Sequence, residues 1–165
     1  MSEERRQAAR TLLGQVELAL EGVRCEATTD CCRFQVTGRE PWLTRVEWEL
    51  LLGELRRQGR RLPTLPDEED GRCPFLDESA RCRVYGARPL GCRTHFCERA
   101  QPAPPRLGEF REAARRLAEL STAWPTDPTT ERANDRDDDG KARPLTRWLA
   151  GEHERPPRPR RGRRR

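Results

Sequence analysis

Apolar residues recur at helical spacing in three stretches of the chain, and each stretch predicts a helix. The clearest covers residues 44–58, where Thr44 and Glu47 have the spacing of a capping box and Gly59 can end the helix. Apolar side chains follow at positions i, i+3, i+4 and i+7, namely Trp48, Leu51, Leu52 and Leu55. That face is predicted to be buried.

Residues 3–22 and 107–121 show the same spacing less completely. The first stretch is expected to stop near Gly22, and its apolar face consists of Ala8, Ala9, Leu12, Leu13, Val16 and Leu20. The second has an apolar face of Phe110, Ala113, Ala114, Leu117 and Leu120. Between them, residues 74–77 and 82–85 read as two short strands around a polar turn, which predicts a β-hairpin.

The apolar pattern stops after Trp124. Residues 125–165 are polar, first acidic and then rich in Arg and Pro, which predicts a mostly disordered linker and tail. A brief apolar island at 144–151 interrupts this segment, and there Trp148 either docks back on the domain or contacts a partner. We therefore expect one folded domain, at residues 1–124.

The composition limits how large a core this domain can build. Only 33% of the residues are apolar, 37% are charged, and the chain also holds 14 Pro and 12 Gly. Small cores are often supplemented by a metal or by disulfides. The first ten residues, MSEERRQAAR, lack the apolar region of a signal peptide, and no stretch approaches the 18 apolar residues of a membrane span. We expect a cytoplasmic protein with no membrane partner, in a reducing compartment where structural disulfides are uncommon.

The net charge of +5 comes from the end of the chain. Residues 155–165, RPPRPRRGRRR, carry seven Arg and no acid, and without them the chain holds 26 basic and 28 acidic residues, a net charge of −2. Such a tail can bind nucleic acid or another acidic partner through phosphate contacts. Basic tails are often simply solvated, and no nucleic-acid recognition motif accompanies this one.

Seven cysteines are the main chemical feature of the sequence. They fall into two groups, first Cys25, Cys31 and Cys32, then Cys73, Cys82, Cys92 and Cys97. Their spacing is neither that of a two-knuckle zinc ribbon nor that of a ferredoxin. Thiolates favour zinc or an iron–sulfur cluster, and seven exceed the four that either needs. One cluster with spare thiols, two metals and a thiol-rich redox site all remain open. Buried unpaired thiols and disulfides are the less favoured alternatives.

Local geometry constrains how these residues can act together. Neighbouring side chains diverge in strands and helices, so Cys31 and Cys32 favour either a polynuclear cluster or one ligand beside a packed thiol. Cys92 and Cys97 lie five residues apart, on different sides of a regular helix, so a shared centre requires irregular chain between them. His95 lies in that interval and is a candidate nitrogen ligand.

The second cysteine group contains a longer motif. The segment CCRF, followed by CPFL and then by C-R-V-Y-x-x-R-P-L-x-C-R, resembles the YkgJ-type cysteine cluster family of zinc- or iron-chelating domains. The resemblance runs from about Cys25 to Cys97. The matching positions are Cys73-Pro74, Cys82, Tyr85, Arg88-Pro89 and Cys92-Arg93. Here five residues separate Cys25 from Cys31, where family members commonly have a denser group, and Cys97 is an addition to the commonest pattern.

The resemblance implies chelation of iron, as a cluster, or of zinc, and it implies no single reaction. The predicted ligands are Cys31, Cys32, Cys73, Cys82 and Cys92, followed by Cys25 and Cys97. Arg88 and Arg93 flank Cys92 and are predicted to bind the cofactor, because a nearby cation lowers a thiol pKa and offsets the negative charge of a cluster.

We expect a small, mainly α domain of the α+β class, with about three helices, one short β-hairpin and cysteine-rich loops around a metal centre. The predicted function is metal binding. A cluster-dependent redox or modifying enzyme, and a metal-stabilised protein that binds nucleic acid through its tail, are the alternatives.

Overall fold

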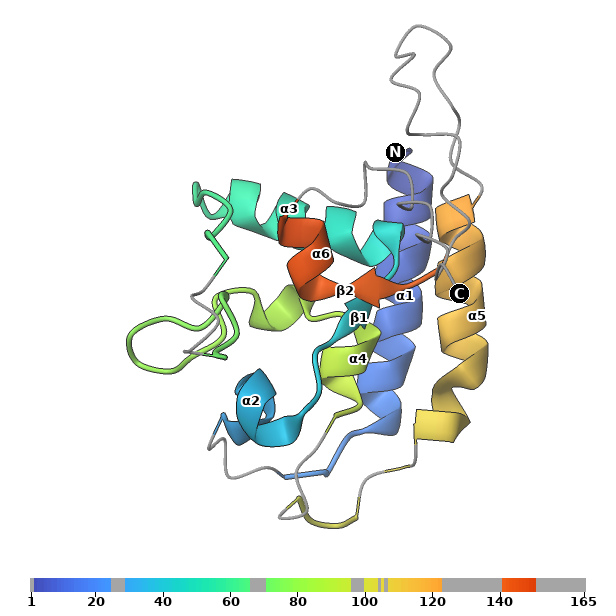
Figure 1. The fold of residues 1–165 in the computed structure, drawn as a ribbon. Helices are drawn as coiled ribbons and strands as arrows, with labels where there is room; N and C mark the ends of the chain where they lie inside the picture. The colour runs from blue at the N-terminus through green and yellow to red at the C-terminus, as the bar shows by residue number, and fades with distance from the viewer. Residues whose placement is uncertain are drawn as a thin grey trace, which may run out of the picture.

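The computed structural model describes residues 2–24, 29–65, 71–95, 100–103, 105, 107–122 and 141–150. Its three longest helices are α1 (Glu3–Ala19), α3 (Arg45–Arg57) and α5 (Arg111–Thr122). The helices contact one another pairwise, with α1 and α5 side by side and α3 across them (Figure 1). They confirm the three predicted helices, and a 3₁₀ turn at Leu107–Phe110 leads into the last one.

The start and end of α3 follow from local sequence. The Glu47 carboxylate accepts hydrogen bonds from the backbone N–H of Thr44 at 2.8 Å and from its hydroxyl at 2.7 Å. This is the carboxylate half of the predicted capping box. After the helix, Gly59 adopts a φ of +65°, a left-handed conformation that glycine reaches at little cost.

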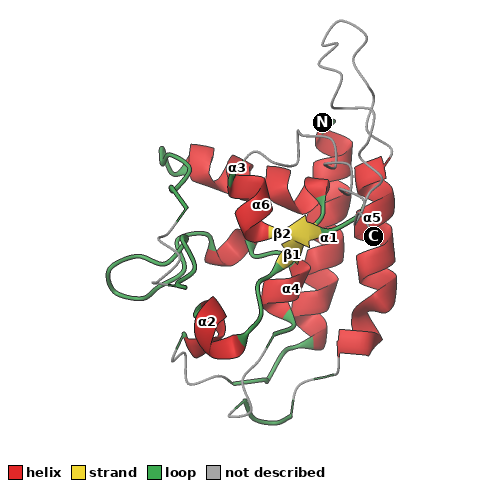
Figure 2. Cartoon of the chain, viewed as in Figure 1, coloured by secondary structure: helices red, strands yellow, loops and turns green. Residues whose placement is uncertain are grey.

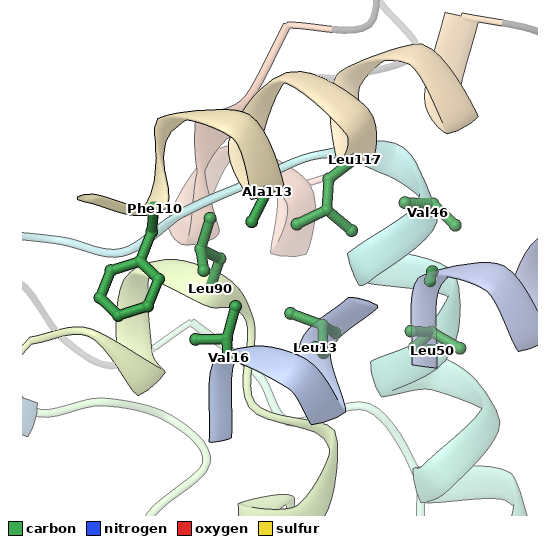
Figure 3. Close-up of a cluster of buried hydrophobic side chains, with 9 residues drawn as sticks. Leu13, Val16, Val46, Leu50, Leu90, Phe110, Ala113 and Leu117 are labelled. Carbon is green, nitrogen blue, oxygen red and sulfur yellow. The ribbon is translucent and has the colours of Figure 1, made fainter. Parts of the chain in front are cut away.

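The three long helices meet around one apolar cluster (Figure 3). The short helix α4 (Leu90–Arg93) joins it through Leu90, so this packing also fixes the element that carries Cys92. The buried members are Ala9, Leu13, Val16, Val46, Leu50, Leu90, Phe110, Ala113 and Leu117.

A second apolar cluster lies on another face of α3. Its buried members are Leu43, Trp48, Leu51, Leu55, Phe75, Val84, Leu145 and Trp148. Cys73 and Cys82 pack against this cluster, which fixes the cysteine-bearing loop between α3 and α4 to the domain. Figure 2 shows that this connection is mostly loop.

The two-stranded sheet joins segments far apart in the chain. Strand β1 (Trp42–Leu43) pairs antiparallel with β2 (Arg143–Pro144), and helix α6 (Leu145–Leu149) follows β2 directly. Trp148 stacks on Trp48 with ring centres 5.8 Å apart and donates its indole N–H to the Leu43 carbonyl at 3.0 Å. The apolar island near the C-terminus therefore packs on the domain.

The fold class is confirmed as a small α+β domain with one antiparallel pair of strands. The strands lie elsewhere than predicted, because residues 74–77 and 82–85 form only one bridge, between Leu76 and Cys82. The left-handed Ala80 makes the turn, and the chain then enters a 3₁₀ turn at Tyr85–Ala87, which ends the pairing.

Much of the predicted linker and tail, residues 123–140 and 151–165, lies outside the described residues, and the domain boundary at 124 stays a prediction. Within the residues that the structure places, no helix is long and apolar enough to cross a membrane.

The docked α6 generates a stability prediction. Trp148 is 2% exposed, so Trp148→Ala should lower the free energy of unfolding by about 3–5 kcal/mol, from lost burial and a new cavity. Trp42 is 58% exposed, and Trp42→Ala is the matched control, with an expected change below about 1 kcal/mol. Urea denaturation measures both. A loss as small for Trp148→Ala as for Trp42→Ala would show that α6 does not stabilise the domain.

Candidate metal centre

Five cysteines from three separate segments line one pocket of about 1550 Å³. Two lie in the 3₁₀ turn Asp30–Cys32, two flank the tight turn of the loop after α3, and one lies in α4. All five are free and partly buried, namely Cys31, Cys32, Cys73, Cys82 and Cys92. The other two predicted ligands, Cys25 and Cys97, fall outside the described residues.

Backbone hydrogen bonds join the two cysteine groups. Cys73 donates its N–H to the carbonyl of Cys32 at 2.7 Å, and Phe34 donates to the carbonyl of Gly71 at 2.6 Å. Gly71 has a φ of +49°, and a Cβ at that position would overlap the side chain of Gln35. Glycine at 71 therefore permits the close approach that brings the two groups together.

The sulfurs of Cys31 and Cys32 lie 3.9 Å apart, and both face the pocket. This differs from the expected divergence of neighbouring side chains. The left-handed Thr29 precedes the pair, which lies in a 3₁₀ turn rather than in a strand or an α-helix. At a zinc–sulfur distance of about 2.3 Å, two thiolates of one tetrahedral site lie about 3.8 Å apart. The pair thus has the spacing of two ligands to one ion.

The remaining three thiols are protonated at neutral pH. Burial raises the pKa of Cys73 to about 12, and burial also raises the pKa of Cys82 and of Cys92. The charges of Cys73 and Cys82 add to the shift at Cys92, so the three groups are close enough to repel one another when ionised. A bound cation would reverse that repulsion.

The adjacent pair Cys31 and Cys32, called the vicinal pair below, ionises differently from these three thiols. The contact with Cys32 lowers the pKa of Cys31 and raises the pKa of Cys32, because one thiolate accepts the remaining S–H. The positive charge of Arg88 also lowers the pKa of Cys31. One thiolate is therefore available in the pocket near neutral pH.

In the described part of the chain, no three His, Cys, Asp or Glu side chains are arranged to hold a metal ion as they stand. The donor set suits zinc or iron, and two of its sulfurs have the required spacing. Completing a four-coordinate site requires two of the remaining thiols to turn toward the pair. Metal sites commonly assemble in this way, because the ion itself supplies the free energy that gathers its ligands.

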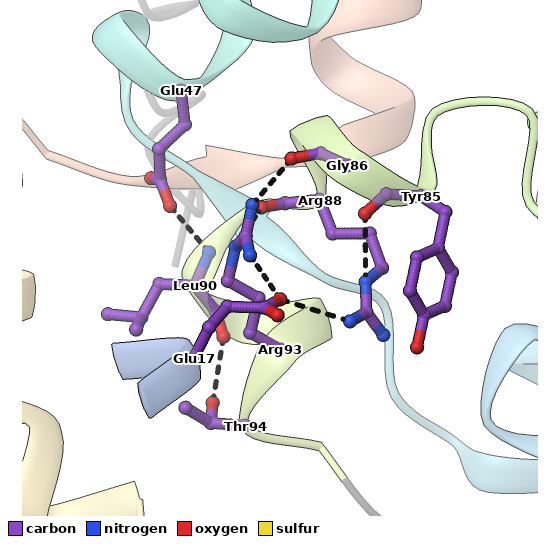
Figure 4. Close-up of polar contacts among 8 residues, drawn as sticks. All are labelled: Glu17, Glu47, Tyr85, Gly86, Arg88, Leu90, Arg93 and Thr94. Atoms are coloured by element: carbon purple, nitrogen blue, oxygen red, sulfur yellow. Dashed lines mark hydrogen bonds and ion pairs between the residues drawn. The ribbon is translucent and has the colours of Figure 1, made fainter. Parts of the chain in front are cut away.

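Arg88 and Arg93 do not lie in equivalent positions (Figure 4). Arg93 is 7% exposed and donates to the carbonyls of Arg88 at 2.7 Å and Gly86 at 2.8 Å. The Arg88 guanidinium lies 3.7 Å from the ring centre of Tyr85. Both arginines also bind the carboxylate of Glu17 on α1.

These contacts separate the electrostatic roles of the two arginines. Burial raises the pKa of Cys82 and Cys92, and the nearby charge of Arg88 opposes that rise. Arg88 also lines the pocket that holds these thiols. Both guanidinium groups bond to Glu17 and to backbone carbonyls, but Arg93 is the more buried and bonds to two carbonyls where Arg88 bonds to one, which makes Arg93 the anchor of the loop.

Two carboxylates near the centre were not predicted from the sequence as part of it. Glu47 is 3% exposed and, besides capping α3, accepts the N–H of Leu90 at 2.7 Å, at the start of α4. Burial raises its pKa, and its three hydrogen bonds oppose that rise. The capping-box spacing indicated the Thr44 contact alone. No sequence pattern indicated Glu17.

His95, the candidate nitrogen ligand, also lines the pocket. Burial, followed by the charge of Arg39, lowers its pKa, which keeps the imidazole neutral and able to bind a metal. The predicted nucleic-acid or acidic partner concerns residues 155–165, which lie outside the described residues.

Comparison with known proteins identifies the class. Residues 24–115, more than half of the chain, match the CxxCxxCC family, described as "putative zinc- or iron-chelating domain", and this chain belongs to that family. The matched segment holds all seven cysteines. Neither a curated protein nor a solved structure shows significant similarity to the chain.

The raised thiol pKa values predict how the metal-free protein responds to pH. Cys73, Cys82 and Cys92 ionise near pH 8.5 once unfolded but at higher pH in the folded chain. The free energy of unfolding should therefore hold below about pH 8.5 and fall as the pH rises above it. Cys32 adds to the loss because its pKa is also raised, whereas the pKa of Cys31 is lowered, so that thiol is ionised in both states above this pH. Beyond the cysteines, the chain has only one Tyr and one Lys.

Urea denaturation of metal-free protein between pH 7.5 and pH 10 measures this loss. The zinc-loaded protein is the control, because thiolates bound to a metal are already deprotonated in the folded state. Stability that is constant or rises with pH in the metal-free protein would contradict the assignment of buried neutral thiols.

Proposed function

We propose that this chain is a metal-chelating protein that binds zinc or iron through cysteine thiolates. The proposed ligands are the five cysteines of the pocket, Cys31, Cys32, Cys73, Cys82 and Cys92. Cys25 and Cys97 are further candidates. The observation that carries the proposal is their convergence, from three segments, on one pocket in a member of a chelating family.

Each part of the pocket has a role in this proposal. The vicinal pair supplies two sulfurs at the spacing of one tetrahedral ion and one thiolate near neutral pH. The thiols of Cys73, Cys82 and Cys92 then turn toward the ion and release their protons to solvent as they bind it. Arg88 offsets the excess negative charge of a multi-thiolate centre.

The 3.9 Å spacing favours a centre in which one ion accepts both sulfurs of the pair. A tetrahedral zinc or iron ion and a binuclear iron–sulfur cluster, whose irons each take two thiolates, meet this condition. We place the protein in the cytoplasm, because free thiols in this number persist in a reducing compartment.

The test is anaerobic purification followed by elemental analysis and a visible spectrum. A colourless protein with bound zinc, or a coloured protein with bound iron, is the expected result, and acid-labile sulfide identifies a cluster. Protein that is free of both metals, and does not take them up when they are added, would overturn the proposed function.

Ligand variants test the assignment residue by residue. Cys92→Ser and Cys82→Ser should each lose most of the bound metal and melt at lower temperature, because metal binding and folding are coupled in small domains. Tyr85→Phe is the control, since Tyr85 lies in the same loop, is 63% exposed and keeps its ring. Full metal content and an unchanged melting curve in Cys92→Ser would remove Cys92 from the ligand set.

A further inference from the structure

Glu17 lies on α1, before the segment 24–115 that matches the family. Its carboxylate nevertheless binds both arginines of the cysteine motif (Figure 4). One oxygen accepts from Arg88 at 3.2 Å and also forms an ion pair with Arg93. These partners stand 71 and 76 residues further along the chain.

Arg93 needs this partner more than Arg88 does. Its side chain is 7% exposed, and burial lowers its pKa while the charge of Glu17 opposes that fall. A buried guanidinium without a counter-charge costs several kcal/mol. The carbonyls of Gly86 and Arg88 satisfy hydrogen-bond donors of Arg93 but supply no full negative charge, and the charge of Glu47 acts on Arg93 less than that of Glu17.

The position of Cys92 depends on the same contacts. Cys92 and Arg93 both donate their N–H to the carbonyl of Pro89, so the cysteine and the anchored arginine belong to one turn. Arg93 ties that turn to residues 86–88 through its guanidinium. Arg88, immediately before the turn, lines the same pocket as the five thiols, and its charge opposes the rise in the pKa of Cys82 and Cys92.

We propose that Glu17 is a positioning residue of the metal centre, which sets Cys92 through Arg93 and orients Arg88 toward the thiols. Among the described residues, the Glu17 carboxylate bonds to the two arginines and to no cysteine, so we do not count it as a ligand. This inference rests on the proposed metal-binding function, and it extends the centre to a helix outside the matched segment. If Glu17 only stabilised the fold, replacing it would lower the melting temperature and leave the metal affinity unchanged.

Glu17→Gln keeps the shape of the side chain and removes its charge. Loss of a residue that orients a metal ligand typically lowers metal affinity 10–100-fold, so a weakening of Zn²⁺ binding by about 10-fold or more is expected. Competition with a chromophoric chelator measures it. Glu21→Gln is the matched control, because Glu21 lines the same pocket and makes no side-chain contact with either arginine. It should bind Zn²⁺ as the wild type does.

Two further readouts separate positioning from stability. Cobalt substitution should give a shifted or weaker thiolate-to-cobalt absorption band in Glu17→Gln, while Glu17→Asp, which keeps the charge, should recover part of the Zn²⁺ affinity. In an Arg88→Met background, Glu17→Gln should cost less affinity than in the wild type, because the two residues act together.

The outcomes distinguish this inference from the function on which it rests. Wild-type protein that binds neither Zn²⁺ nor Co²⁺ overturns both. Wild-type protein that binds Zn²⁺, with unchanged affinity and cobalt spectrum in Glu17→Gln, overturns the positioning role alone. A lower melting temperature with unchanged affinity would likewise assign Glu17 to the fold only.

Discussion

The buried carboxylate of Glu47 joins the two helices on which the candidate centre depends. It accepts two hydrogen bonds from Thr44 at the start of α3 and one from the Leu90 N–H at the start of α4. A carboxylate at 3% exposure is costly unless its oxygens are satisfied, and here three donors satisfy them. The start of α3 and the turn that holds Cys92 are thereby fixed to each other before any metal binds.

Around this junction the chain builds two small apolar clusters instead of one large core. The first is made by the long helices, and the second holds the cysteine loop and α6 against another face of α3. With 33% apolar residues, neither cluster is large, so a metal bound between the cysteine segments would add a cross-link to a small core. The contacts that hold the cysteine segments in place, including the ion pair of Glu17 with Arg93, would then support both metal binding and the stability of the fold.

The features predicted correctly from the sequence depend on interactions between residues close together in the chain. The three helices and the cap of α3 depend on residues a few positions apart, and the cysteine motif identified the family. Most of the missed features are long-range. Strand β1 pairs with a segment about a hundred residues later, and Glu17 binds arginines 71 and 76 residues away. The close approach of Cys31 and Cys32 depends on one left-handed residue, Thr29, which no periodicity reveals.

X-ray absorption spectroscopy of the protein purified without oxygen tests the central claim most directly, because it counts the atoms bound to the metal. We expect a shell dominated by sulfur at about 2.3 Å, with one nitrogen in place of a sulfur if His95 takes part. A shell of oxygen and nitrogen alone would show that the metal binds elsewhere. It would contradict the assignment of the five-cysteine pocket as the metal centre.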